Sequence, residues 1–272
     1  MISSSSNPRI KFLKSLAERR EREKERKFVI EGIHLVSEAL ASQEKEKKFR
    51  LESVFFSKRA SASKEGDALL KRLLKANVEL VEVSEKVMTD VSDVEAPQGI
   101  VAVLPAVEDN IEDIVSVKVP LIVVCHGVQD PGNLGTIIRS ADAFGASGIL
   151  LGSGTVDVYN PKTLRSSMGS VFHLPIVVFD DVKVGLRRLK EKGVSLLATT
   201  LKAQALGKSD LVSSCAVVFG AEGAGLPEDV LKMCDRTAMI PMPGGAESLN
   251  VGVAASIVLY EAVRQRQEKE NA

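Results

Sequence analysis

Short, continuous runs of apolar residues recur along the second half of the chain. Helix-favouring sequences lie between several of these runs, which are Leu121–Val124, Ile149–Leu151, Val194–Leu197, Ala216–Phe219 and Ala238–Ile240. Strands that are apolar on both faces and alternate with helices are typical of a parallel sheet covered on each side. We therefore predict an α/β domain with a mostly parallel sheet over residues 120–268.

The first hundred residues predict a second, smaller α/β unit. Residues 78–83 alternate apolar with acidic side chains, the pattern of a half-buried strand, and Asp67 is a candidate N-cap for a leucine-rich helix that Asn77 ends. The other predicted strands cover 28–30, 51–56 and 100–104, and the other predicted helices cover 8–27 and about 32–41. Prolines flank the acidic stretch 105–119, so we predict domains at 1–105 and 120–268 joined by a linker at 106–119.

The charged residues are balanced over the whole chain but not near its N-terminus. The 272 residues carry a formal net charge of zero, but residues 1–60 hold fifteen Lys and Arg against nine Asp and Glu. Most of the excess lies between Arg9 and Lys27. Such a segment suits a phosphate-rich partner, or it is simply a solvated helix face.

The cysteine content and hydropathy restrict the cellular setting. Cys125, Cys215 and Cys234 lack framework spacing, which favours buried free thiols in a reducing compartment over disulfides or a metal site. No apolar run reaches the ~18 residues that a membrane span requires. We expect a soluble, cytoplasmic protein without a metal. The Ser3–Ser6 run near Arg9 resembles part of a transit peptide, but no long Ser- and Arg-rich, acid-poor lead accompanies it. An organellar location stays open if the chain is a mature or truncated form.

A polar loop follows the first strand of the larger domain. Asp130 and Pro131 favour a turn, and Asn133 is a candidate N-cap for a helix that Gly145 ends. Arg139 lies opposite the apolar stripe of this helix, near the edge where open α/β sheets bind ligands. The alternative is an ordinary solvated arginine.

Two more loops of this kind follow later strands. Residues 220–227 contain three glycines around Glu222, in a spacing that matches neither a dinucleotide-binding nor a nucleoside-triphosphate-binding motif. Residues 240–250 form a loop rich in Pro and Gly, and Ser248 and Asn250 lie at the predicted N-terminus of the last helix. That stretch alone also fits an ordinary strand–loop–helix junction. Cys125, His126 and His173 form no recognisable catalytic set.

Together the three loops resemble a known family. The matching blocks are Asp130-Pro131-x-Asn133-x-Gly135-x-x-x-Arg139-x-Ala141-x-x-Phe144-Gly145, Gly220-x-Glu222-Gly223-x-Gly225-Leu226 and Ile240-Pro241-Met242-x-Gly244-x-x-Glu247-Ser248-Leu249-Asn250-Val251. In this order and spacing they resemble the SpoU (TrmH-type) branch of the SPOUT RNA methyltransferases. Residues 160–175 resemble the middle segment of that family. Gly252 departs from the pattern, because a serine is common there.

The N-terminal part resembles, more loosely, a ribosomal-protein-like RNA-binding domain that precedes such catalytic domains. The resemblance rests on Asn7-Pro8-x-Ile10-Lys11, Phe28-x-Ile30-Glu31-Gly32 and Pro97-Gln98-Gly99-Ile100. It makes the serine run part of the domain start rather than a transit peptide.

The resemblance implies a deep trefoil knot, S-adenosyl-L-methionine as cofactor, and a homodimer formed through the methyltransferase domain. Carried over by position, the cofactor would be held by Thr199, Gly220, Ile240 and Leu249. Arg139 would act on a ribose 2′-hydroxyl, with Asn133, Glu222, Ser248 and Asn250 orienting it and lining the site. A guanidinium is a poor proton acceptor, so an electrostatic and positioning role for Arg139 is preferred over that of a base.

These implications lead to an RNA ribose 2′-O-methyltransferase, with ribosomal RNA favoured over transfer RNA as substrate. Two alternatives belong to other classes: an RNA-binding assembly factor that has lost catalysis, and a nucleotide-binding α/β enzyme. The missing phosphate-loop pattern argues against the latter. The basic helix between Arg9 and Lys27, with Arg19, Arg20 and Arg22, is the candidate RNA contact.

Overall fold

The computed structural model describes residues 1–45 and 48–271 and divides the chain into two compact units. The N-terminal unit comprises Met1–Val107 together with Tyr159–Phe172. The C-terminal unit comprises Glu108–Val158 and His173–Ala272. Each unit has its own sheet and core, as the sequence predicts for an α/β chain with a smaller first unit.

The N-terminal unit is built on a mixed sheet whose described strands run in the order β1-β4-β2-β3. Strand β4 is antiparallel to both neighbours, and β2 is parallel to β3. All four predicted strands are confirmed, as β1 (Lys27–Glu31), β2 (Ser53–Phe56), β3 (Glu79–Glu82) and β4 (Ile100–Pro105). The middle strand β4 is almost entirely buried, because helices cover both of its faces.

Different helices cover the two faces of this sheet. One face packs against α1 (Pro8–Ser15) and α6 (Glu85–Val91), where Ile10 and Val87 meet Val101 of β4. Residues of β4 that alternate with Val101 turn to the other face, which α3 (Ile33–Lys45) and α5 (Lys64–Lys75) cover. Two short helices, α2 (Arg19–Glu25) and α4 (Lys58–Ala62), complete the first hundred residues.

Two predicted details of this unit are wrong. The single helix predicted over 8–27 is interrupted, because α1 ends at Ser15 and α2 begins at Arg19. The leucine-rich helix begins at Lys64, where the Ser63 hydroxyl accepts a hydrogen bond from the Gly66 N–H, so Ser63 and not Asp67 is its cap.

The segment Tyr159–Phe172 lies between two strands of the other sheet but packs inside the N-terminal unit. It contains α9 (Pro161–Ser167) and a 3-10 turn, η1 (Ser170–Phe172). The Tyr159 ring stacks on Phe28 with ring centroids 4.1 Å apart, and Phe172 packs edge-on against Phe49 at 5.1 Å. These aromatic contacts make the segment part of the N-terminal core.

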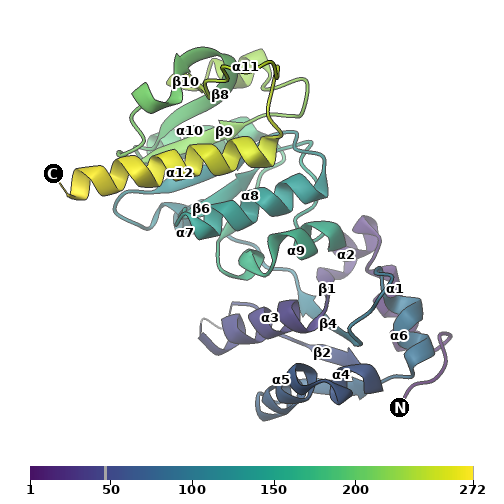
Figure 1. Ribbon diagram of the computed structural model, residues 1–272. Helices are drawn as coiled ribbons and strands as arrows, with labels where there is room; N and C mark the ends of the chain where they lie inside the picture. The colour runs from purple at the N-terminus through teal and green to yellow at the C-terminus, as the bar shows by residue number, and fades with distance from the viewer. Residues whose placement is uncertain (46–47, 272) are drawn as a thin grey trace. The chain divides into compact units, whose positions relative to one another are not determined.

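The C-terminal unit contains a fully parallel sheet, ordered β10-β8-β9-β5-β6-β7 among the described residues (Figure 1). Its strands are β5 (Leu121–Cys125), β6 (Gly148–Leu151), β7 (Ile176–Val178), β8 (Ser195–Ala205), β9 (Cys215–Phe219) and β10 (Arg236–Met239). The apolar runs predict all of these except β7, whose three residues follow Pro175. The parallel arrangement is thus confirmed, and the trefoil knot stays a prediction.

Helices cover both faces of this sheet. On one face, α7 (Ile111–Val115), α10 (Val182–Glu191) and α11 (Glu228–Leu231) form a core with alternate residues of the central strands. On the other, α8 (Pro131–Ala143) and α12 (Val251–Glu270) run alongside each other, joined by a 2.7 Å hydrogen bond between the Ser140 and Ser256 hydroxyls (Figure 1). The predicted linker at 106–119 contains α7.

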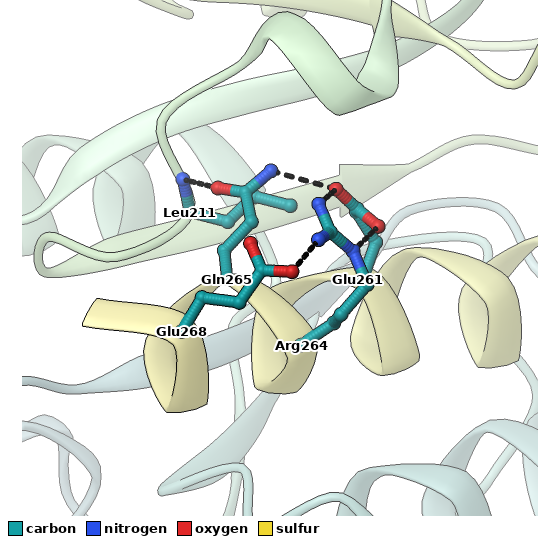
Figure 2. Close-up of polar contacts among 5 residues, drawn as sticks. All are labelled: Leu211, Glu261, Arg264, Gln265 and Glu268. Atoms are coloured by element: carbon teal, nitrogen blue, oxygen red, sulfur yellow. Dashed lines mark hydrogen bonds and ion pairs between the residues drawn. The ribbon is translucent and has the colours of Figure 1, made fainter. Parts of the chain in front are cut away.

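The last helix, α12, continues to Glu270, because hydrogen bonds and ion pairs hold its charged last turns in place (Figure 2). Gln265 accepts from the backbone N–H of Leu211 at 3.1 Å and donates to Glu261 at 2.9 Å. Arg264 bonds both Glu261 and Glu268. Across residues 1–45 and 48–271, none of the helices is long and apolar enough to cross a membrane.

Candidate functional site

The loop after β5 positions Asn133 on the first turn of α8. Asp130, not Asn133, is the N-cap, because its carboxylate accepts a hydrogen bond from the Asn133 backbone N–H at 2.8 Å. Pro131 occupies the first turn, where its missing N–H costs nothing. The predicted cap is therefore wrong by three residues. The correction leaves the Asn133 amide group available for contacts outside its own helix.

Glu222 lies at the tip of a tight glycine loop after β9. The backbones of Ala221 and Gly225 pair across the loop, with N···O distances of 3.1 and 2.9 Å. Gly223 and Gly225 have φ values of +85° and +68°, which favour glycine. A Cβ on Gly220 would come within 2.3 Å of the Gly225 carbonyl carbon. The glycines are therefore required by the loop itself, which holds the exposed Glu222 at a fixed place.

Three of the predicted catalytic residues form one hydrogen-bonded chain. Asn133 donates through Nδ2 to Oε1 of Glu222, and its Oδ1 accepts from Nδ2 of Asn250 at 2.8 Å. Asn250 is the N-cap of α12, with Oδ1 accepting from the N–H groups of Gly252 and Val253 at 2.9 and 3.2 Å. The structure thus brings together side chains from all three loops.

The other two predicted catalytic residues are outside this chain of hydrogen bonds. Arg139 is exposed on α8, opposite the buried Leu134, Ile138 and Ala141, as its place in the sequence predicts. Its guanidinium makes no hydrogen bond or ion pair with any residue that the structure describes. Ser248 is also exposed, and within the described chain its side chain has no partner. Both are free to meet a ligand.

The residues predicted to hold the cofactor follow the carboxyl ends of adjacent strands. Gly220 follows β9 directly, and Ile240 follows β10. Thr199 begins a bulge in β8: Thr237 of β10 pairs with Ala198 and the next residue, Ala238, pairs with Gln204, so residues 199–203 loop out of the ladder. The Thr199 hydroxyl donates to the Val218 carbonyl at 3.0 Å.

The last loop offers unused backbone groups and apolar surface at the same edge. Between residues 240 and 249, no backbone N–H or C=O is hydrogen-bonded to another residue in the described ranges. Leu249 is 37% exposed, and Leu201 in the bulge of β8 is 62% exposed. An adenine ring needs apolar walls with backbone donors and acceptors around them, so these residues fit S-adenosylmethionine. Leu201 is absent from the residues predicted by sequence, because its bulge depends on the β10 register.

Of the three groups that the sequence sets aside as non-catalytic, Cys125 and His173 have clear structural states, whereas the buried Nδ1 of His126 has no hydrogen-bond partner among the described residues. Complete burial raises the pKa of the Cys125 thiol to about 12, which leaves it protonated and inert. His173 pairs with the Asp142 carboxylate at 2.8 Å. No cluster of His, Cys, Asp and Glu that could hold a metal occurs among the described residues.

The candidate RNA contact between Arg9 and Lys27 is weaker than its sequence indicates. Arg22 is only 5% exposed, and its guanidinium donates to the carbonyls of Leu16 and Ala17 at 2.9 and 2.6 Å. Arg9 pairs with Glu79, and Arg19 pairs with Glu23. Much of the positive charge is thus neutralised or buried, and Arg22 has a structural role.

Comparison with known proteins matches both units. Residues 120–260 match the family described as SpoU rRNA Methylase, and residues 7–102 match the MRM3-like substrate binding domain. Over 95% of the chain, it is 38% identical to the 23S rRNA (guanosine(2553)-2′-O)-methyltransferase RlmP of Bacillus subtilis, 97% of which is covered.

Solved structures agree along the whole chain. A crystal structure of an RNA 2′-O ribose methyltransferase superimposes with a TM-score of 0.82 at 36% identity, covering 98% of this chain and 99% of the other. The AdoMet-bound rRNA methyltransferase from Sinorhizobium meliloti gives a TM-score of 0.85 at 31% identity, with 97% of each chain covered. The similarity therefore includes the N-terminal unit.

Proposed function

Because this chain belongs to the SpoU rRNA methylase family, we propose that it transfers a methyl group from S-adenosylmethionine to a ribose 2′-hydroxyl of ribosomal RNA. The observation that carries the proposal is the hydrogen-bonded chain Glu222–Asn133–Asn250, which joins the three loops at one edge of the parallel sheet. Open α/β sheets bind their ligands at this edge.

The cofactor supplies a methyl group bound to a positively charged sulfur. In the transfer, the sulfur–carbon bond would break as a bond from that carbon to the ribose 2′-oxygen forms. A neutral thioether would be left, and the hydroxyl proton would pass to water. Residues at the three strand ends would hold the adenosine part. Ile240 and Leu249 would supply apolar contact, and the close packing of Gly220 against Gly225 would keep the glycine loop in place.

Arg139 would act on the RNA side of the reaction. Its exposed guanidinium can donate to a phosphate and stabilise negative charge developing on the 2′-oxygen. A guanidinium has a pKa above about 12, so it binds and orients better than it accepts a proton. The chain of hydrogen bonds through Asn133 would fix the loops around the substrate.

A homodimer through the C-terminal unit is also proposed. Helix α12 leaves Val253 and Tyr260 exposed at 46% and 58%, and Tyr260 contacts Phe144 of α8 edge-on at 6.2 Å. Exposed apolar side chains on neighbouring helices suit an interface. Light scattering should give the mass of a dimer for the native chain and of a monomer for Tyr260→Glu. A native monomer would contradict the proposal.

The enzymatic proposal is tested by incubating the purified protein with labelled S-adenosylmethionine and deproteinised ribosomal RNA, and by mapping 2′-O-methyl nucleotides in total RNA with and without the gene. One ribosomal site should depend on the gene. A site in transfer RNA instead would favour the alternative substrate. Failure to bind S-adenosylmethionine in calorimetry, with no lost site, would favour an inactive assembly factor.

A further inference from the structure

A groove of about 680 Å³ lies beside α3 and α5 of the N-terminal unit. Its volume lies in the ~300–1,000 Å³ range of small-molecule sites. Ile33 and Leu69 give it an apolar part, and His34, Arg59, Arg72 and Gln98 give it polar walls. The groove lies entirely within the unit that resembles a substrate-binding domain.

Two arginines of the groove are held in place yet keep free donors. Arg59 donates through one Nη to the Pro97 carbonyl at 3.0 Å, and Arg72 bonds Glu44 at 3.0 Å and the Ser37 hydroxyl at 3.4 Å. Their side chains remain 55% and 43% exposed. A guanidinium has five N–H donors, so each retains donors for a ligand after these contacts are made. Its fixed position lowers the entropy lost on binding.

The helices beside the groove carry concentrated positive charge. The segment Lys58–Lys75, which contains α4 and α5, has six Lys and Arg and only two acidic residues, Glu65 and Asp67. All six basic side chains belong to exposed residues. Lys71 pairs with Asp67, whereas Lys58, Lys64 and Lys75 have no carboxylate partner among residues 1–45 and 48–271. Arg59 also lies 3.8 Å from Glu85, so both this segment and Arg9–Lys27 carry ion pairs. The difference is that Arg59 and Arg72 line a concave groove.

We propose that this groove, rather than the Arg9–Lys27 segment, is the principal RNA contact of the N-terminal unit and accepts an unpaired nucleotide with its phosphates. The inference rests on the proposed function, because the groove would be a binding site for the RNA substrate of that reaction. Single-stranded regions of RNA present bases that stack on guanidinium planes, and their phosphates attract Arg and Lys. Arg59 and Arg72 bind the nucleotide, and the lysines of α4 and α5 hold the flanking backbone.

The test compares charge-matched variants. Arg59→Gln/Arg72→Gln removes two positive charges from the groove. Lys64→Gln/Lys75→Gln, called the rim variant, removes two from the ends of α5, the helix that lines the groove. Lys11→Gln/Arg20→Gln removes two from exposed positions on α1 and α2. Neither Lys11 nor Arg20 has a side-chain partner in the described part of the chain. Affinity for deproteinised ribosomal RNA is measured by filter binding at several salt concentrations, and cofactor affinity by calorimetry.

The groove and rim variants should each bind RNA about tenfold more weakly. The slope of log affinity against log salt concentration should become shallower by about 0.7 for each lost phosphate contact. The control variant should change less than about twofold, and all variants should bind S-adenosylmethionine like the native chain. Equal losses in the groove and control variants, or a larger loss in the control, would overturn the proposal.

Two readouts keep the outcomes separate. If Arg59→Gln/Arg72→Gln lowers the thermal unfolding midpoint, the rim variant decides, because its lysines make no contact that folding requires. If the native chain binds ribosomal RNA through the groove but transfers no methyl group, the proposed function fails and the inference stands. If it methylates RNA and the groove variants bind normally, the inference alone fails.

Discussion

The side chain of Asn250 donates a hydrogen bond to that of Asn133 at 2.8 Å, across 117 positions of sequence. The Asn250 amide has one orientation, because its oxygen accepts from two backbone N–H groups of α12. Asn133 must therefore present its oxygen to Asn250 and its nitrogen to Glu222. One helix cap thus determines the orientation of an amide in another loop.

Asn133→Asp should lower methyl transfer more than tenfold at neutral pH, with little loss of stability because Glu222 and Asn250 are exposed and Asn133 is only half-buried. The new carboxylate would still accept a hydrogen bond from the Asn250 amide. It would have no N–H to donate to Glu222, so two carboxylates would repel each other there. Adding Glu222→Gln supplies an N–H donor and should restore much of the rate. Initial rates of the single and double variants measure this. A double variant no faster than Asn133→Asp would contradict the amide's orienting role.

Arg139→Ala should abolish methyl transfer and leave S-adenosylmethionine affinity within about twofold, since Arg139 is assigned to the RNA side of the site. Arg139→Lys keeps the charge but loses the planar fork of donors, so it should retain only a small part of the activity. Calorimetry and single-turnover rates check both. Full turnover by the alanine variant would end the assignment.

Gly220→Ala should displace the glycine loop, because the added Cβ would lie 2.5 Å from both the Gly225 oxygen and the Leu226 nitrogen. We expect a stability loss of about 1–3 kcal/mol and cofactor binding at least tenfold weaker. Gly245→Ala is the matched control, since among the described atoms nothing lies within 4 Å of its added Cβ. Urea unfolding and calorimetry provide the readouts. Similar behaviour of the two variants would be inconsistent with steric exclusion at Gly220.

Arg22→Ala should cost about 2 kcal/mol of unfolding free energy, because two carbonyls at the turn between α1 and α2 lose a charged donor. Arg20→Ala, at an exposed position of the same helix, should change stability by less than about 0.5 kcal/mol. Urea denaturation separates the two. Equal effects would show that the buried contacts of Arg22 do not stabilise the turn.

Alkaline pH should destabilise the protein partly through Cys125, whose pKa is raised by burial to about 12. An unfolded thiol loses its proton near pH 8.5, so above that pH the unfolded state binds fewer protons than the native state. Stability then falls as the pH rises, by up to about 1.4 kcal/mol per pH unit for this thiol. Cys125→Ala should show a shallower decline between pH 9 and 10.5. Parallel curves for the two proteins would refute this contribution.

The sequence predicts most strands and the three polar loops because each has a local cause. Continuous apolar runs give β5, β6, β8, β9 and β10, and glycine and proline mark the loops. The Ser63 and Asp130 caps are less certain from sequence, since several polar residues near a helix start can serve. Only the folded backbone selects the one whose oxygen reaches an N–H group.

Features that depend on contacts between residues far apart in the chain cannot be predicted from the sequence pattern. Strand β7 is three residues long and is recognisable only from its pairing with β6. The buried state of Arg22 depends on a break between two helices that the charge pattern does not reveal. Of the predicted catalytic residues, Asn133, Glu222 and Asn250 are in contact, and the roles of all five, with Arg139 and Ser248, stay predictions.

The placement of Tyr159–Phe172 also bears on protein engineering. The chain passes between the two compact units three times, after Val107, after Val158 and after Phe172. A chimera that exchanges only the first hundred residues would give Tyr159 and Phe172 a foreign set of aromatic partners. Replacing the N-terminal unit with that of a relative therefore requires both segments, Met1–Val107 and Tyr159–Phe172, to be exchanged together.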